Sequence, residues 1–167
     1  MKNHKRNLFC FGTGYTAKAI AKLALTIEKS DNWAVYGSYR RHEQAKTLVE
    51  LGIIPIKFAD VANILSNVDA ILSSIPPTKE GDPVLNHYGD LLSKVDKKTW
   101  IGYLSTTGVY GDTKGELVNE TAPLKPTSDR SRRRTIAEKN WLGYAAHIFR
   151  LPGIYGPERS SFDRLRN

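Results

Sequence analysis

The stretch Phe9-Cys10-Phe11-Gly12-Thr13-Gly14-Tyr15-Thr16-Ala17 joins an apolar run to a G-x-G-x-x-A turn and to the start of a segment with helical periodicity. Gly12 permits a tight turn, Gly14 lets the backbone approach a pyrophosphate, and Ala17 lets the helix lie close to the strand. The helix N-terminus, beginning at Tyr15 and Thr16, offers unpaired N–H groups to phosphates. The stretch therefore predicts a dinucleotide-binding turn over Gly12, Thr13 and Gly14.

The rest of the chain repeats this alternation of strand and helix. The predicted strands are Leu8–Phe11, Ala34–Gly37, Ile53–Phe58, Ala70–Ile75, Trp100–Leu104 and Ala145–Leu151, and the predicted helices are Tyr15–Lys29, His42–Glu50, Val84–Val95 and Ser131–Trp141. Continuous apolar strands joined by helices predict an α/β fold of the Rossmann type, a doubly wound parallel sheet with helices on both faces. Gly111–Ser128 reads as a long loop of the kind that carries function.

Bulk composition narrows the class of protein. The chain has 167 residues, 40% of them hydrophobic, which suits one globular domain, and no apolar run approaches a membrane span or signal-peptide core. We therefore expect a soluble, cytoplasmic protein with no metal site. Basic residues give a net charge of +8 but are scattered apart from Arg130 and Arg132–Arg134, so nucleic-acid binding is only a minor alternative. The single Cys10 is expected in the core.

The predicted second strand ends in Gly37-Ser38-Tyr39-Arg40-Arg41, without the acidic residue that would bind the ribose hydroxyls of NAD. A guanidinium at Arg40 or Arg41 can hold a 2′-phosphate and stack on adenine, which favours NADP over NAD. Alternatively, both are ordinary surface residues at the start of a helix.

Three later motifs occur in order: Ser105-Thr106-Thr107-Gly108-Val109-Tyr110-Gly111, Glu120-Thr121-Ala122-Pro123, and Arg150-Leu151-Pro152-Gly153-Ile154-Tyr155-Gly156-Pro157. Together they resemble the extended and atypical short-chain dehydrogenase/reductases, the NAD-dependent epimerase/dehydratase family. The turn variant GTGYTA and the run Ser73-Ser74-Ile75-Pro76-Pro77 are most similar to its YeeZ-like branch. The resemblance covers nearly the whole chain and implies six or so strands in the order 3-2-1-4-5-6.

The resemblance also implies roles for individual residues. The adenine amino group would contact Asp60, with Val61 beside it, and the nicotinamide-side ribose would lie over Ser73, Ser74, Ile75 and Pro76. The nicotinamide amide would contact Pro152, Gly153, Ile154 and Tyr155. The substrate oxygen would bind Thr106, with Ser105 and Thr107 as neighbours. Each also has a structural alternative: Asp60 as a helix N-cap, the serines as polar strand ends, and the Pro-Gly turn as a chain reversal.

One departure from the family concerns chemistry. Its mechanism uses a Tyr and, four residues later, a Lys that lowers the phenol pKa. With Glu138 taken as the acid that follows this motif, Arg130 stands at the Tyr position and Arg134 at the Lys position. Arg134 could hold a ribose hydroxyl or a phosphate, but Arg130 cannot serve as an acid near neutral pH. Turnover by the usual mechanism is therefore expected to be negligible.

A second departure concerns length, since family members continue into a smaller C-terminal part that builds the substrate pocket. We expect that part to be missing, through truncation of the chain or shortening of the gene. The leading interpretation is an NAD(P)-binding protein related to oxidoreductases or nucleotide-sugar epimerases and dehydratases, with a carbonyl or sugar-nucleotide substrate if active. The alternatives are a non-catalytic dinucleotide sensor and a decayed fragment. The family also implies a homodimer formed through Val84–Val95 and Ser131–Trp141.

Overall fold

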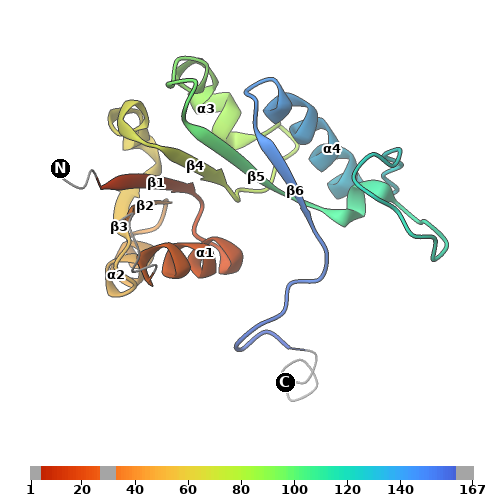
Figure 1. Cartoon of the computed structure of the whole chain (residues 1–167), viewed down its shortest axis with the longest axis horizontal. Coiled ribbons are helices and arrows are strands. Elements are labelled where there is room, and N and C mark those ends of the chain that lie inside the picture. Colours follow the sequence, from red (N-terminus) through yellow and green to blue (C-terminus); the bar gives the residue numbers. More distant parts are fainter. Residues whose placement is uncertain (1–4, 27–32, 161–167) are drawn as a thin grey trace.

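Six parallel strands form one sheet in the computed structural model, which describes residues 5–26 and 33–160. The strands are β1 (Arg6–Phe11), β2 (Trp33–Tyr39), β3 (Ile54–Lys57), β4 (Ala70–Ser73), β5 (Trp100–Thr106) and β6 (His147–Leu151). Their order is β3-β2-β1-β4-β5-β6, as Figure 1 shows. This confirms the predicted doubly wound α/β fold.

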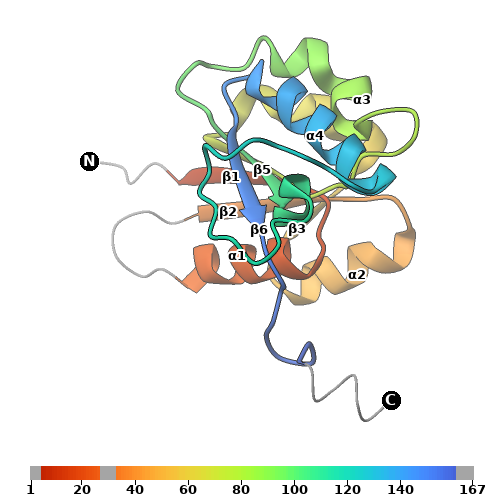
Figure 2. The same cartoon turned by 90° about the vertical axis from the view of Figure 1, so that its right-hand side faces the viewer.

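Within the described residues, four α-helices lie on the two faces of this sheet. In Figures 1 and 2, α1 (Tyr15–Thr26) and α2 (His42–Glu50) lie below it, and α3 (Pro83–Leu92) and α4 (Asp129–Leu142) above it. The predicted helix His42–Glu50 has the observed bounds, whereas residues 27–29 of the predicted first helix lie outside the described residues. Short 3-10 helices span η1 (Phe58–Asn63), η2 (Leu65–Asn67) and η3 (Thr107–Tyr110).

Two predicted strands are shorter than expected at one end. The predicted strand Ala145–Leu151 begins only at His147, because Ala145 has a φ of 54° in the turn that follows α4. The predicted strand Ala70–Ile75 ends at Ser73, and Ser74 turns to donate its hydroxyl to the carbonyl oxygens of Phe11 and Gly12. Tight turn geometry and tertiary hydrogen bonds, rather than residue type, set these ends.

The sheet buries apolar side chains on both faces, as alternation along a strand requires. On β1, Phe9 and Phe11 belong to the cluster between the sheet and helices α3 and α4. Leu8 and Cys10 belong to the cluster between the sheet and helices α1 and α2. Trp141 of α4 is fully buried against Tyr103 of β5, with ring centroids 5.4 Å apart.

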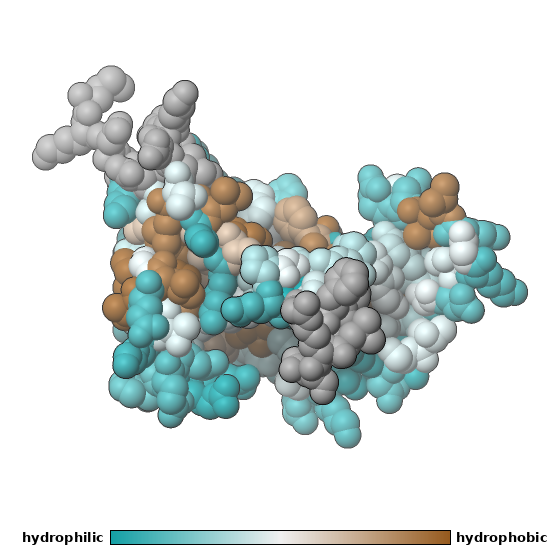
Figure 3. Space-filling model, turned by 90° about the horizontal axis from the view of Figure 1, so that it is seen from below, coloured by the Kyte–Doolittle hydropathy of each residue, from teal (hydrophilic) through white to brown (hydrophobic). Residues whose placement is uncertain are grey.

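Part of the lower face of the sheet is uncovered. Beside α1 a groove of about 760 Å³ runs over β4, β5 and β6, and its floor includes Leu72, Leu104 and Leu151. Trp100 and Phe149 on this groove are 38% and 42% exposed, and hydrophobic residues gather on this side of the molecule in Figure 3. Within residues 5–26 and 33–160, no helix packs over this half of the face. None of the described helices has the length and apolar character that a membrane span needs.

Candidate functional site

The predicted site residues follow the carboxyl ends of the strands. β1 lies between β2 and β4 in the sheet, and the chain leaves β1 into α1 below the sheet but later runs from β4 into α3 above it. Such a reversal opens a crevice outside the carboxyl ends of the two strands, where open α/β sheets bind ligands. The glycine turn after β1 and Ser74 after β4 meet at this point.

Gly12 has the backbone geometry that the motif requires. Its φ is 77°, and a Cβ there would lie 2.8 Å from Cγ1 of Ile75. Its N–H donates a hydrogen bond of 2.8 Å to Oγ of Ser38, which fixes the turn against the end of β2. At Gly14, by contrast, an added Cβ would meet no atom within 4 Å. The backbone at Gly14 is therefore open to an approaching ligand, while Gly12 is closely packed.

Two residues that support the turn were missed in the sequence. Ser38 is buried and accepts the Gly12 hydrogen bond, and a Cβ on Gly37 would lie only 2.6 Å from Cγ2 of Thr13. No sequence pattern marks either role, because both depend on the distance between β2 and the turn. The strand-end serines also differ: Ser74 bonds the turn, but the buried Oγ of Ser73 has no partner in the described structure.

The residues predicted to bind the adenosine half follow the carboxyl ends of β2 and β3. Arg40 and Arg41 are exposed, and their backbone N–H groups both donate to Oε1 of Gln44 at the start of α2. No described residue forms an ion pair with either guanidinium. Asp60 is exposed within η1 rather than at its N-cap, so the capping alternative is wrong, and the side chain of Val61 is fully buried.

Most of the residues predicted to surround the nicotinamide half line one pocket of about 430 Å³. It brings together the start of α1, the ends of β4 and β5, the helix α4 and the chain after β6. The predicted residues that line it are Gly14, Tyr15, Thr16, Ser74, Ser105, Thr106, Arg130, Arg134, Pro152, Gly153, Ile154 and Tyr155. Gly12, Thr13, Arg40, Arg41, Asp60, Val61, Ser73, Ile75 and Pro76 do not line it.

The two hydroxyl residues at the end of β5 have different partners. Oγ1 of Thr106 accepts a hydrogen bond of 3.2 Å from the N–H of Gly108, which leaves its hydroxyl proton available in the pocket. Ser105 instead donates its hydroxyl to the carboxylate of Glu138. Thr106 is therefore the better placed of the two to bind a ligand.

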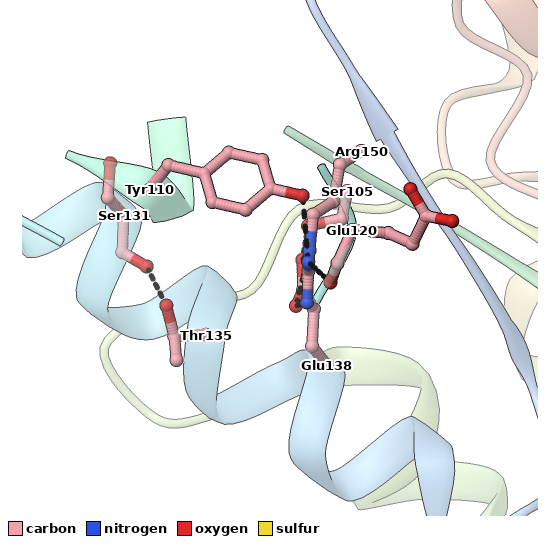
Figure 4. A network of polar contacts seen from close by, with 7 residues as sticks. All are labelled: Ser105, Tyr110, Glu120, Ser131, Thr135, Glu138 and Arg150. Carbon is pink, nitrogen blue, oxygen red and sulfur yellow. Dashed lines mark hydrogen bonds and ion pairs between the residues drawn. The ribbon is translucent and has the colours of Figure 1, made fainter. Parts of the chain in front are cut away.

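Glu138 belongs to a buried polar network above the sheet (Figure 4). Its Oε2 lies 2.9 Å from Nη2 of Arg150, and Nη1 of Arg150 donates at 2.9 Å both to the Tyr110 hydroxyl and to the carbonyl of Glu120. The hydrogen bonds from Arg150 to the Glu138 carboxylate raise the pKa of Arg150, which keeps this guanidinium protonated. This network ties α4, β6 and the long loop together; the sequence marked Glu138 only as a motif residue.

Arg130 and Arg134 both line the pocket from α4, but they differ in burial. Arg130 is exposed, whereas Arg134 is buried with its Nη1 donating to the Tyr103 hydroxyl at 2.9 Å and to the Leu104 carbonyl at 3.0 Å. No tyrosine and lysine stand four residues apart on this helix. Within the described residues, no group of three or more metal-ligating side chains is present either.

The chain after β6 folds back toward the glycine turn. The Tyr15 hydroxyl donates to the carbonyl of Pro157 at 3.1 Å, and the guanidinium of Arg159 lies 5.3 Å from the centre of the Tyr15 ring. These contacts place the segment over the start of α1, so it forms one wall of the pocket.

Solved structures share this fold. A functionally unknown conserved protein from Silicibacter pomeroyi is 38% identical, with a TM-score of 0.86 over 96% of this chain and 57% of that one. UDP-glucuronic acid 4-epimerase from Bacillus cereus, in complex with NAD, is 18% identical with a TM-score of 0.67 over 95% of this chain and 62% of that one. dTDP-glucose 4,6-dehydratase from Bacillus anthracis, also in complex with NAD, is 17% identical with a TM-score of 0.73 over 96% of this chain and 60% of that one.

The chain therefore spans about 57–62% of the length of these three proteins. A scan against protein-family models found no match, and a search of curated proteins found none either. The fold is thus that of NAD-binding epimerases and dehydratases, and the activity is a separate question.

Proposed function

We propose that this chain is a dinucleotide-binding domain of the short-chain dehydrogenase/reductase superfamily, related to its epimerase/dehydratase family and YeeZ-like branch. The observation that carries the proposal is the glycine turn at the switch point, closely packed at Gly12 and open at Gly14. This turn leaves room for a pyrophosphate, to which the first N–H groups of α1 would donate hydrogen bonds. The NAD complexes of the epimerase and the dehydratase, which share the fold, support it.

The proposed placement puts adenosine near Arg40, Arg41 and Asp60 and the nicotinamide end in the 430 Å³ pocket. Arg40 and Arg41 favour NADP, because exposed guanidiniums that pair with no described carboxylate can form charge-assisted bonds to a 2′-phosphate. When bound, the dinucleotide would supply a nicotinamide that gives or accepts a hydride.

Within that pocket the hydroxyls of Thr16, Thr106 and Tyr155 donate to no described residue, and no lysine lines it to form the family's Tyr and Lys proton relay. Guanidiniums stay protonated at ordinary pH, so Arg130 and Arg134 can bind and orient a ligand but cannot act as its acid or base. This favours a binding role over an oxidoreductase or epimerase reaction in this chain. Saturable oxidation of NADPH with aldehydes, ketones or nucleotide-4-keto sugars, lost in Thr106→Ala, would instead favour the enzyme.

Calorimetric titration of the purified chain with NADP and with NAD tests the proposal. We expect saturable binding, and we expect Gly14→Val to abolish it, because its side chain would occupy the space of the pyrophosphate. Since no protein atom lies within 4 Å of a Cβ at Gly14, the circular dichroism spectrum should not change. Gly12→Ala is the contrasting variant and should destabilise the fold itself. Unchanged affinity in a folded Gly14→Val protein would refute the assignment.

A further inference from the structure

The 430 Å³ pocket is strongly basic. Of the described residues, three arginines line it, Arg130 and Arg134 from α4 and Arg159 from the segment after β6, and no aspartate or glutamate does. A concave surface that gathers charges of one sign raises the local concentration of ions of the other sign.

Arg134 is buried and forms no ion pair with any residue that the structure describes. It is 8% exposed, and its Nη1 donates to two neutral oxygens, the Tyr103 hydroxyl and the Leu104 carbonyl. Burial raises the pKa of Tyr103 well above its usual range, so this phenol stays neutral beside the guanidinium. Nε and Nη2 of Arg134 have no hydrogen-bond acceptor among the described residues.

Arg150, by contrast, has a guanidinium whose charge is neutralised by a carboxylate. Arg150 forms an ion pair with Glu138, and Glu138 follows Arg134 by one helical turn on α4. Both Glu138 oxygens are engaged by Arg150, and Ser105 donates to one of them. Because Glu138 is committed there, Arg134 keeps an unpaired charge. A buried charge costs free energy unless a partner of opposite sign neutralises it.

Arg130 and Arg159 extend this charge across the pocket. Arg130 precedes Arg134 by four residues, so both lie on the same face of α4, and no described residue pairs with Arg130. Arg159 lines the pocket from the segment that Tyr15 holds; its Nε donates to the Ile154 carbonyl at 3.2 Å. Among the described residues, none accepts a hydrogen bond from its two terminal nitrogens.

We propose that this pocket is an anion site, in which Arg134, flanked by Arg130 and Arg159, binds a phosphate or carboxylate group. The position of that group beside a nicotinamide rests on the proposed function, whereas the anion site rests on the unpaired arginines alone. The group belongs either to a second, anionic ligand or to the phosphates of the dinucleotide itself. In either case, arginines here bind charge where a Tyr and Lys would relay a proton.

Titration with inorganic phosphate, followed by ³¹P NMR of the full chain, tests the proposal. We expect saturable binding by the native protein and a dissociation constant raised at least about tenfold in Arg130→Ala and in Arg134→Gln. Arg134→Gln alters a buried residue that packs on Tyr103, so the exposed Arg130→Ala decides the matter if the former does not fold.

Arg132→Ala is the matched control. It removes the same charge from the same helix, but Arg132 pairs with Asp129 at 2.7 Å and does not line the pocket. Its dissociation constant for phosphate should stay within about twofold of the native value. Equal weakening by Arg132→Ala would mean a general surface-charge effect and would overturn the proposal, as would unchanged binding in Arg130→Ala or no saturable binding by the native chain.

Two further titrations separate the sources of the anion. Phosphate that still binds when NADP is saturating identifies a second anionic ligand, and phosphate displaced by NADP identifies the dinucleotide's own phosphates. Phosphate binding by a chain that fails to bind NADP or NAD would leave the anion site standing and remove the proposed function. Binding of NADP without arginine-dependent binding of phosphate would support the proposed function and remove the anion site.

Discussion

At the scale of single residues, Arg40 and Arg41 set the proposed choice between the two dinucleotides. Both are exposed, and their backbone N–H groups rather than their guanidiniums are used to start α2. The side chains are therefore available to a 2′-phosphate, which only NADP carries, at no cost to the helix.

Replacing both residues by alanine should weaken NADP binding more than NAD binding, by about 1–3 kcal/mol, because a charge-assisted phosphate contact is lost. Parallel calorimetric titrations with the two cofactors measure the difference. Lys46→Ala, which removes an exposed cation further along α2, is the control and should leave the preference unchanged. Equal weakening of both cofactors would show that neither arginine contacts the 2′-phosphate.

Part of this site could be predicted from residue types and their spacing, whereas the rest depends on contacts between residues far apart in the sequence. The roles of Gly12 and Gly14 follow from their spacing before a helix, and the structure shows the tight turn at Gly12 and the open backbone at Gly14. Ser38 and Gly37 matter because β2 passes within contact distance of the turn, which no local pattern encodes. The pairing of Glu138 with Arg150 likewise joins residues 12 positions apart on different elements.

At the scale of elements, α4 is held by its buried polar face as much as by apolar contacts. Arg134, Ala137, Glu138 and Trp141 are its buried residues, so two of the four are charged. Glu138→Gln should lower the free energy of unfolding by about 1–3 kcal/mol, because Arg150 would lose its charged partner in a largely buried position. Urea denaturation of the two proteins measures the difference.

The exposed pair on the same helix provides the comparison. Asp129 and Arg132 form an ion pair whose side chains are 80% and 54% exposed, so Asp129→Asn should leave the free energy of unfolding nearly unchanged. A Glu138→Gln protein as stable as the native one would mean that the network contributes no net stability and serves position alone.

The bounds of helices and strands could be predicted where the local sequence pattern sets them, but not where turn geometry or tertiary contacts do. His42–Glu50 was predicted with its observed bounds from period and composition. The start of β6 was not, because the left-handed turn at Ala145 is formed by a residue with no special preference for it. The apolar residues of β4 to β6 predicted cover on both faces, yet α1 and α2 cover only the other half of the lower face.

At the scale of the whole molecule, exposed apolar residues lie on both sides of the sheet. On the upper side, Leu91 of α3 and Ile136 and Leu142 of α4 are 37%, 60% and 58% exposed. On the lower side, Leu23 of α1 is 62% exposed and lines the same groove as Trp100 and Phe149. Exposed apolar patches of this kind mark association surfaces. The resemblance to the epimerase/dehydratase family favours the upper one, and we propose that two copies pair through α3 and α4.

Sedimentation equilibrium of three proteins decides between these surfaces. The native chain should form a concentration-dependent dimer, and Ile136→Glu should shift it toward monomer, because a charge buried in an apolar interface without a partner is costly. Leu23→Glu is the matched control: it places the same charge at an equally exposed leucine on the opposite side and should leave the dimer intact. A native chain that stays monomeric would contradict the proposed pairing. A dimer that survives Ile136→Glu but dissociates with Leu23→Glu would instead place the contact on the uncovered half of the sheet, and the groove over β4 to β6 would then be the surface that a second copy covers.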